Sequence, residues 1–490
     1  MKNLFNSILL FLFIALVFTS CTKDFAKYNL NPDAITSVDP GALLSDALVN
    51  TSSVDMFPRT AYCHAFMQFG YANDWAGNAY VATDDVSQRY WNNFYRPALN
   101  DLEYVVPVLK ARTDMQSTYA AARIWRVFIY QKLTDYYGDI PYSQAGKALS
   151  DKVFTPVYDP QQKIYADFVN ELRESITLLT NNSSQKVSGD QFYSGNAAQW
   201  KKLAASMLLK IGMRLIKIDP TQAATLAKEA IADGVMTSNA DMPVLLHNSA
   251  TANGFNFTLN DGQNHFFLHK TLVTEMKVAG DPRLAIYGAV YDTFVANGGT
   301  PQSSDTTKFI GYSYKASDPA PNTRVNYDVF GQKDTPFFDF AYAEVEFLTA
   351  EAIVRGYITG SAADHYTAGI TGHMQSLSKL SGNPVITNAQ INAYLAKNPL
   401  PATSEAQIAK INTEFWVAGF VFDADEVWAN WRRTGYPVLT PNPGTSGVIP
   451  RKIPYPQSEF TLNNANVTAA LANYGGTNDF NSKARVWWDK

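Results

Sequence analysis

The sequence predicts a mainly α-helical fold in which helix pairs stack as an α-solenoid and support long, loop-rich segments. Hydrophobic residues make up 46% of the 490 positions, which is typical of a globular chain. Apolar side chains recur at helical spacing in several long stretches, and helix pairs joined by short turns can stack by covering one another's apolar faces. Period-two patterns are short and fall within residues 240–335, so we expect few strands.

Six stretches carry the apolar stripe of an amphipathic helix. Their predicted ranges are 117–136, 160–180, 196–217, 221–233, 341–357 and 404–422. Pro160 suits the start of the second helix and Asn196 is a favourable N-cap for the third. Gly138 and Gly234 follow the first and fourth helices and favour their ends. No strict repeat of about 34 residues accompanies these helices, so periodicity alone does not establish a repeat protein.

Three long segments separate or follow the helices: residues 50–96, 240–335 and 436–490. They are rich in glycine, asparagine, proline and aromatic residues. Segments of this length inside a compact chain usually carry function or small structure of their own. Because no linker composition divides the chain, we expect residues 21–490 to form one folded unit, with these segments as its ligand-binding portions.

The first twenty residues have the pattern of a secretory signal peptide. Lys2 precedes an eleven-residue apolar run, Ile8–Phe18, and small residues then lead to Cys21. This layout resembles a bacterial lipoprotein box, in which Cys21 becomes the lipid-bearing first residue. No other apolar run reaches 18 residues, so we expect a soluble body attached to a membrane by acyl chains. Cys63 is then left without a disulfide partner and is expected to be a buried thiol.

The charge balance argues against nucleic-acid binding. Lysine and arginine number 40 against 44 acidic residues, giving a net charge of −4, and no basic block is present to neutralise phosphates. Charged residues make up only 17% of the chain while aromatic residues make up 13%. Such a composition favours a neutral polar ligand over an ionic one.

Catalytic and metal-binding signatures are missing from the sequence. His265 and His269 have the spacing of a zinc-protease motif, but Phe266 stands where the glutamate base is required, so packing or capping roles are favoured. We predict no catalytic residue, no metal ligand set and no cofactor. Acidic residues that could hold a structural calcium ion do not have calcium-loop spacing, and solvated or helix-capping roles are favoured for them: Asp84, Asp85, Asp423, Asp425 and Glu426.

Short motifs follow one another along almost the whole chain. They are NPDAITSVDPGALLSDAL (31–48), TDYYGDIPYSQAG (134–146), YDPQQKIYADFVNELRESITLL (158–179), DPRLAIY (281–287), VWANWRRTGYPVL (427–439), IPRKIPYPQSEFTLN (449–463) and KARVWWDK (483–490). Behind a lipid-acceptor cysteine, this succession resembles the SusD/RagB family of nutrient-binding outer-membrane lipoproteins, specifically its SusD-like branch.

The resemblance implies a tetratricopeptide-like α-solenoid on the outer membrane, exposed at the cell surface and anchored through Cys21. It also implies a partner, a TonB-dependent SusC-like outer-membrane transporter over which the lipoprotein lies as a lid. The implied function is binding of a nutrient, above all a glycan or oligosaccharide, without covalent chemistry. A secreted helical-toroid glycosidase or polysaccharide lyase is the alternative, since two carboxylates in an aromatic cleft can cleave a glycosidic bond. A purely structural surface protein is a third possibility.

Residues 62–95 are the strongest candidate for a binding loop, with ten aromatic side chains interleaved with polar ones. A pyranose has an apolar C–H face that flat rings cover, and a rim of hydroxyls that amides and carboxylates bind. Trp75 is the first choice for a stacking platform and Tyr80 the second; packing of Trp75 onto the solenoid remains equally open. The other candidate ligand-binding residues of this segment are Tyr71, Asn73, Asp74 and Asn78. Trp91, Phe94 and Tyr95 are expected in the core.

A second candidate loop spans residues 291–330. It contributes Tyr312, Tyr314 and Arg324 to the predicted binding site, and loops in this part of SusD-like proteins often form the ligand face. Two further features lie within the C-terminal motifs of the resemblance. The pair Arg432–Arg433 is expected to form ion pairs with Asp425 or Glu426, and the pair Trp487–Trp488 is expected to anchor the C-terminus by packing.

Overall fold

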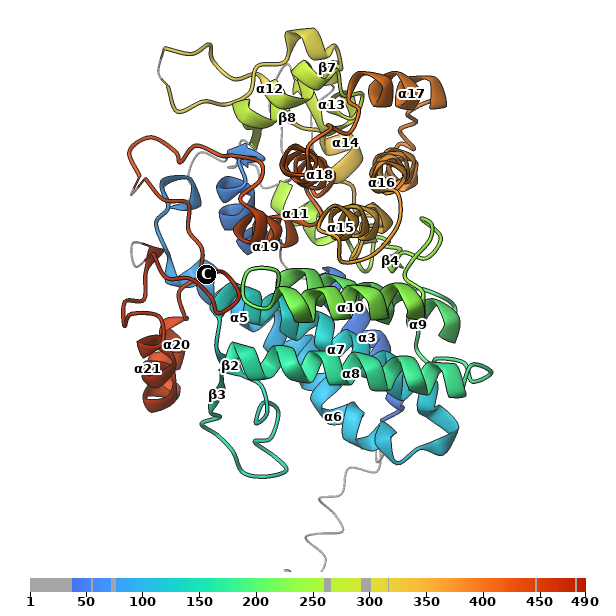
Figure 1. Ribbon diagram of the computed structural model, residues 1–490. Helices are drawn as coiled ribbons and strands as arrows, with labels where there is room; N and C mark the ends of the chain where they lie inside the picture. The colour runs from blue at the N-terminus through green and yellow to red at the C-terminus, as the bar shows by residue number, and fades with distance from the viewer. Residues whose placement is uncertain are drawn as a thin grey trace, which may run out of the picture. The chain divides into compact units, whose positions relative to one another are not determined.

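A computed structural model describes residues 38–53, 56–71, 76–259, 266–291, 301–315, 317–445, 447–480 and 483–490. The predicted signal peptide and Cys21 lie outside the described residues. Residues Pro40–Lys490 form one unit, and this unit is mainly α-helical, as the sequence predicts (Figure 1). None of the helices described there combines the length and the apolar composition that crossing a membrane requires.

The α-helices are numbered in chain order. Their bounds are α3 (Pro40–Ser53), α4 (Phe57–Arg59), α5 (Asp84–Asn93), α6 (Asn100–Lys110), α7 (Gln116–Tyr137), α8 (Gln161–Asn181), α9 (Ala197–Arg214), α10 (Pro220–Asp233), α11 (Gly254–Leu259), α12 (Lys270–Ala279), α13 (Leu284–Tyr287), α14 (Tyr327–Phe330), α15 (Tyr342–Val354), α16 (Ala362–Ser376), α17 (Asn388–Lys397), α18 (Ser404–Ala418), α19 (Ala424–Thr434), α20 (Gln457–Leu462) and α21 (Asn464–Ala472).

Helices α7 to α10 form the first layer of the solenoid. Each packs against the next one in the chain, and Figure 1 shows α7, α8, α9 and α10 lying side by side. Their ends follow the sequence signals: Gly138 takes a φ of 80° directly after α7, and the Asn196 side chain accepts a hydrogen bond of 3.0 Å from the Ala198 N–H at the start of α9. All six predicted helices are present. The sixth stops at Ala418 rather than at residue 422, because Val421 adopts a left-handed backbone with a φ of 70°.

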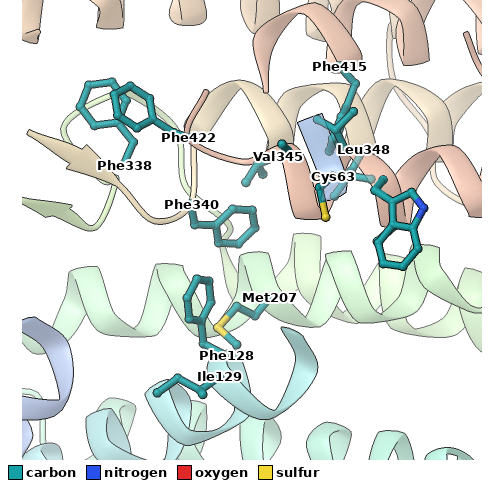
Figure 2. Close-up of a cluster of buried hydrophobic side chains, with 14 of the residues drawn as sticks. Cys63, Phe128, Ile129, Met207, Phe338, Phe340, Val345, Leu348, Phe415 and Phe422 are labelled. Carbon is teal, nitrogen blue, oxygen red and sulfur yellow. The ribbon is translucent and has the colours of Figure 1, made fainter. Parts of the chain in front are cut away.

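A second helical group packs on this layer. Helix α15 contacts α16 and α18 on its own side and α9 and α10 of the first layer. Figure 2 shows the apolar interface, in which Phe128 of α7 and Met207 of α9 face Phe340, which precedes α15. Leu348 of α15 and Phe415 of α18 continue the same cluster, and all five side chains are at most 4% exposed. This contiguous core makes the solenoid a rigid support for the loop-rich segments.

Nine short strands complete the unit. They are β1 (Gly70–Tyr71), β2 (Ile140–Pro141), β3 (Tyr158–Asp159), β4 (Val244–Leu245), β5 (Phe267–Leu268), β6 (Gly288–Tyr291), β7 (Pro301–Ser303), β8 (Thr323–Val325) and β9 (Phe337–Phe338) among the described residues. Five of them form an antiparallel sheet in the order β1-β5-β8-β6-β7.

The expectation of few, short strands is confirmed, but some strands lie outside residues 240–335, where the period-two patterns occur. Strands β1, β2, β3 and β9 lie outside that window, and each has two residues, which is too short to show a period-two pattern. The segments 50–96 and 436–490 also contain helices, α5 in the first and α20 and α21 in the second. The regular structure in these loop-rich segments is short, but it fixes where their side chains lie.

The predicted partners of Arg432 and Arg433 were also wrong. The Arg433 guanidinium donates two hydrogen bonds, each 2.7 Å long, to the carboxylate of Glu351 on α15. The Arg432 guanidinium lies 3.7 Å from the Trp428 ring centroid and donates a 2.6 Å hydrogen bond to the Asp135 carbonyl. Asp425 and Glu426 stand earlier on α19 and face other cations.

Those other cations belong to the first part of the chain. Asp425 contacts Arg59 at 3.3 Å and Lys132 at 3.0 Å, while Glu426 accepts from Arg214 at 2.6 Å. All these groups are buried. Asp425 and Glu426 therefore join layers of the fold, and the solvated role considered for them does not fit this burial among cations.

One buried carboxyl makes stability depend on pH. Asp339 is 3% exposed and accepts a 2.5 Å hydrogen bond from the Ser52 hydroxyl, and burial raises its pKa to about 7, above the value of about 3.9 in an unfolded chain. Its contribution to stability is therefore fully present below about pH 4 and is lost as pH rises through 7. We expect Asp339→Asn to remove this loss, so that its thermal midpoint exceeds that of the wild type at pH 8 by more than at pH 4.

Thermal unfolding followed by circular dichroism at these two pH values measures the effect. An identical pH dependence in Asp339→Asn and the wild type would show that folding does not raise the pKa of Asp339.

Candidate functional site

Two tyrosines distant in sequence meet at the edge of the five-stranded sheet. Tyr71 ends β1 and is the direct partner of Phe267 on β5. On the other side of β5, the Tyr312 N–H donates to the Leu268 carbonyl at 2.8 Å, and the Lys270 N–H donates to the Tyr312 carbonyl at 2.8 Å. Gly311 permits this approach, because a Cβ atom there would lie 2.8 Å from backbone atoms of Lys270. The backbone thus fixes both tyrosines beside one strand.

The rings of Tyr71, Tyr312 and Tyr314, which we call the tyrosine cluster, form an ordered arrangement. Tyr71 and Tyr312 are stacked, with ring centroids 3.4 Å apart and planes 3° apart. Tyr314 stands at right angles to both, at 5.7 Å from Tyr71 and 5.2 Å from Tyr312. All three are partly exposed. Burial raises the pKa of the Tyr312 and Tyr314 hydroxyls, so these two remain uncharged hydrogen-bonding groups.

Asn442 ties the tyrosine cluster to the loop that follows β1. Its side-chain amide donates to the Tyr314 hydroxyl at 2.9 Å and to the Asn78 carbonyl at 3.0 Å. Its backbone N–H donates to the Tyr80 hydroxyl at 3.1 Å, and the Tyr314 hydroxyl donates to the Asn78 side chain at 3.3 Å. The predicted residues Asn78, Tyr80 and Tyr314 are therefore linked through a residue that the sequence analysis missed. Its place in Pro441-Asn442-Pro443-Gly444, a turn-forming sequence, was the available signal.

An open groove of about 460 Å³ begins at this cluster. Tyr314 and Asn442 form part of its wall, and Gln68, Lys270 and Asp318 form other parts. The Lys270 ammonium contacts the Asp318 carboxylate at 2.7 Å, so these opposite charges at the rim are paired. One further cation, Lys315, and one further anion, Glu275, also line the groove, so the formal charges of its described lining residues cancel. Rings, amides and balanced charges together suit an uncharged ligand with hydroxyl or amide groups.

Arg324 lies on the same face of the sheet as Tyr71. Tyr71 pairs with Phe267, and Phe267 pairs with Arg324 across the next strand, and direct cross-strand partners share one face. The Arg324 guanidinium lies 4.4 Å from the Phe267 ring centroid. Two strand spacings place Arg324 about 10 Å from Tyr71. Phe267, which the sequence analysis did not select, thus connects two predicted site residues.

The other predicted residues of the first loop divide into two groups. Tyr80 is 3% exposed and its ring meets Phe66 edge-on at 5.9 Å, so it has no open ring face and supports the cluster only through its hydroxyl. This placement does not fit the stacking role proposed for it. Asn73, Asp74 and Trp75 lie outside the described residues, and their roles stay predictions.

The histidine and the cysteine that could have reactive side chains, His269 and Cys63, are buried and have structural roles. His269 caps α12, where its Nδ1 accepts from the Thr271 N–H at 3.1 Å, and burial lowers its pKa to about 3; His265 lies outside the described residues. Burial raises the pKa of the Cys63 thiol to about 12, which keeps it protonated and unreactive.

Trp91 and Phe94 are buried as expected, and Tyr95 is partly buried against the core. Asp84 and Asp85 occupy the first turn of α5, where negative charge is favourable. No cluster of three or more histidine, cysteine or acidic residues suited to a metal ion occurs in the described part of the chain.

Comparison with known proteins gives a consistent result. Residues 32–456 match a SusD-like family model described as "Starch-binding associating with outer membrane". A solved chitin-binding protein is 30% identical, with a TM-score of 0.79 over 92% of this chain and 100% of the other. A SusD-like protein from Bacteroidetes is 27% identical, with the same TM-score and the same coverage. A SusD homologue from Bacteroides fragilis, 24% identical, has a TM-score of 0.73 over 93% of this chain and 100% of its own. Among curated proteins, no match is found.

Proposed function

Because the chain belongs to the SusD-like family of outer-membrane-associated proteins, we propose that it binds a glycan or oligosaccharide at the cell surface. It then passes the ligand, chemically unchanged, to a TonB-dependent SusC-like transporter in the outer membrane. The solved relative at 30% identity that is named a chitin-binding protein supports a polysaccharide ligand. The proposal includes neither a cofactor nor a metal ion in the binding step.

The observation that carries the proposal is the tyrosine cluster at the end of an open groove. The outer face of the stacked Tyr71–Tyr312 pair can cover the apolar C–H face of a pyranose, and the two side chains, already stacked, lose little conformational entropy on binding. Tyr314 and the amide of Asn442 stand beside them and can exchange hydrogen bonds with ring hydroxyls or an acetamido group. An apolar surface with a few polar groups at its edge is the usual composition of a small-ligand site.

The groove favours binding over hydrolysis. A glycosidase needs a carboxylic acid with a raised pKa opposite a second carboxylate. Two carboxylates, those of Asp318 and Glu275, line the groove, and the hydrogen bond from Lys270 lowers the pKa of Asp318. A carboxylate held in this way is a poor proton donor at neutral pH.

Purified protein lacking residues 1–21 tests binding against catalysis. We expect saturable binding of chitotriose, cellotriose or maltotriose by calorimetry, with each sugar recovered intact after prolonged incubation. Release of reducing ends in proportion to protein concentration would identify a glycosidase instead, and absence of binding to all three sugars would contradict the proposal.

Membrane attachment through Cys21 is the second part of the proposal, supported by the apolar run before it and the family's association with the outer membrane. We expect Cys21→Ala to move the protein from the membrane fraction to the soluble fraction after cell lysis. Cys63→Ala, which removes the other cysteine of the chain, is the matched control and should remain in the membrane fraction. Continued membrane fractionation of Cys21→Ala would rule out a lipid anchor at this residue.

A further inference from the structure

The two C-terminal tryptophans have different surroundings. Trp488 is fully buried, and its indole N–H donates to the Asp135 carboxylate at 2.8 Å. Trp487 packs against the core but is partly exposed. The prediction of a packing anchor therefore accounts fully for Trp488, whereas one part of Trp487 is left facing solvent.

That part of Trp487 lines a groove of about 330 Å³ on the helical layer. The groove lies between the first half of α8 and the turn that joins α9 to α10, and it shares no residue with the groove at the tyrosine cluster. Tyr165 of α8 is 2% exposed at its base, and its ring centroid is 5.9 Å from that of Trp487. Two aromatic side chains thus form an apolar corner.

Three amide side chains stand around this corner: Gln162 and Asn170 on α8 and Gln222 on α10. Within the described part of the chain, none of these side chains makes a hydrogen bond to another residue. Each amide offers two donors and an acceptor, and Gln162 and Asn170 are exposed while Gln222 is partly so. Their hydrogen-bonding capacity is available to a ligand.

The charges at this groove favour an uncharged ligand. Arg173 makes two 2.6 Å hydrogen bonds to Glu229, so its guanidinium is committed to a carboxylate of α10. The Asp219 carboxylate accepts from the Gln222 backbone N–H as the N-cap of α10. A partly exposed indole with uncommitted amides matches the two surfaces of a pyranose, its C–H face and its hydroxyl rim.

We propose that this groove is a second glycan-binding site, with Trp487 as the stacking ring and Gln162, Asn170 and Gln222 as hydroxyl-binding groups. Its volume is at the lower end of the roughly 300–1,000 Å³ of small-ligand sites, so it takes one or two sugar units of a neutral oligosaccharide. The choice of ligand class rests on the proposed function, whereas the site itself rests on this groove alone. A chain with two separate sites holds a polysaccharide more tightly than either site does, because the second contact becomes intramolecular.

Calorimetry with a trisaccharide tests the proposal, because two sites give a binding stoichiometry of two per chain. We expect the protein lacking residues 1–21 to bind two molecules of chitotriose, cellotriose or maltotriose per chain. Trp487→Ala should bind one molecule per chain, with affinity for the remaining site unchanged, and Trp487→Phe should keep two. Because Trp487 also contacts the core, the thermal midpoint of each variant is measured. The double variant Asn170→Ala/Gln222→Ala, which changes only rim residues, should weaken the same site by about tenfold.

The outcomes separate this proposal from the proposed function. Binding of one trisaccharide per chain that Tyr312→Ala abolishes and Trp487→Ala leaves unchanged would overturn the second site and leave the proposed function intact. Loss of one site in Trp487→Ala, with no effect of Tyr312→Ala on the other, would support the second site and contradict the tyrosine cluster. No binding of any of the three sugars by the wild type would overturn both.

Discussion

Replacing Tyr312 with alanine is expected to weaken glycan binding at the tyrosine cluster by about tenfold or more, equivalent to about 1.4 kcal/mol. Tyr312 stacks on Tyr71 at a centroid distance of 3.4 Å, so the substitution removes one ring and leaves the other without its support. Because Tyr312 is partly exposed, the loss of packing is small, and the thermal midpoint should change by only a few degrees. Calorimetry measures the change in affinity, and thermal unfolding of the same preparation measures the change in thermal midpoint.

Tyr312→Phe is the matched control for this prediction. It keeps the stacked ring and removes only the hydroxyl, so its affinity should stay within about threefold of the wild type. A large fall in the thermal midpoint of Tyr312→Ala without any change in affinity would assign Tyr312 to packing. Trp75→Ala should likewise weaken ligand retention with little change in the thermal midpoint, if the residue has the role predicted from the sequence.

Replacing Arg433 with methionine is expected to lower the free energy of unfolding by about 3–5 kcal/mol. Arg433 is 2% exposed and Glu351 is fully buried, and two hydrogen bonds of 2.7 Å join them. Burial alone would raise the pKa of Glu351, but the guanidinium groups of Arg433 and Arg355 together outweigh burial and hold this pKa at about 2. Without Arg433 the buried carboxylate of Glu351 keeps Arg355 and Asn412 as its polar partners among the described residues. Thermal unfolding should show a midpoint lower by about 3–5 °C.

The double variant Arg433→Met/Glu351→Gln separates the charge effect from the packing effect. It removes the buried carboxylate together with its partner, so it should recover a large part of the stability lost in Arg433→Met. A single variant Arg433→Met as stable as the wild type would show that the ion pair does not hold α15 and α19 together.

The helical part of the fold could be predicted because its signals are local. The stripe of α8 and the cap at Asn196 each depend on residues within one or two turns. The sheet could not be predicted in the same way. Strand β1 has two residues, and its partner β5 lies almost 200 positions further along the chain; such pairing is set by the packed solenoid and not by local propensity.

The sequence predicted which residues belong to the candidate site, but it did not predict how their side chains are arranged in space. Composition selected Tyr71, Tyr312 and Tyr314. The structure brings Tyr71 and Tyr312 together because β5 pairs with β1, which carries Tyr71, and also hydrogen-bonds to the backbone of Tyr312. Composition also selected Tyr80, whose ring is buried, since exposure within an aromatic loop cannot be derived from its sequence. Asn442 escaped notice because its contacts with Asn78 and Tyr314 join segments far apart in the chain.

The most direct test of the binding site is a crystal structure of the protein with the trisaccharide that it binds best in calorimetry. We expect an intact sugar whose C–H face lies against the outer ring face of the stacked Tyr71–Tyr312 pair, with a hydroxyl or acetamido group near Tyr314 and Asn442. A cleaved sugar, or an intact sugar bound elsewhere while the tyrosine cluster stays empty, would contradict this account.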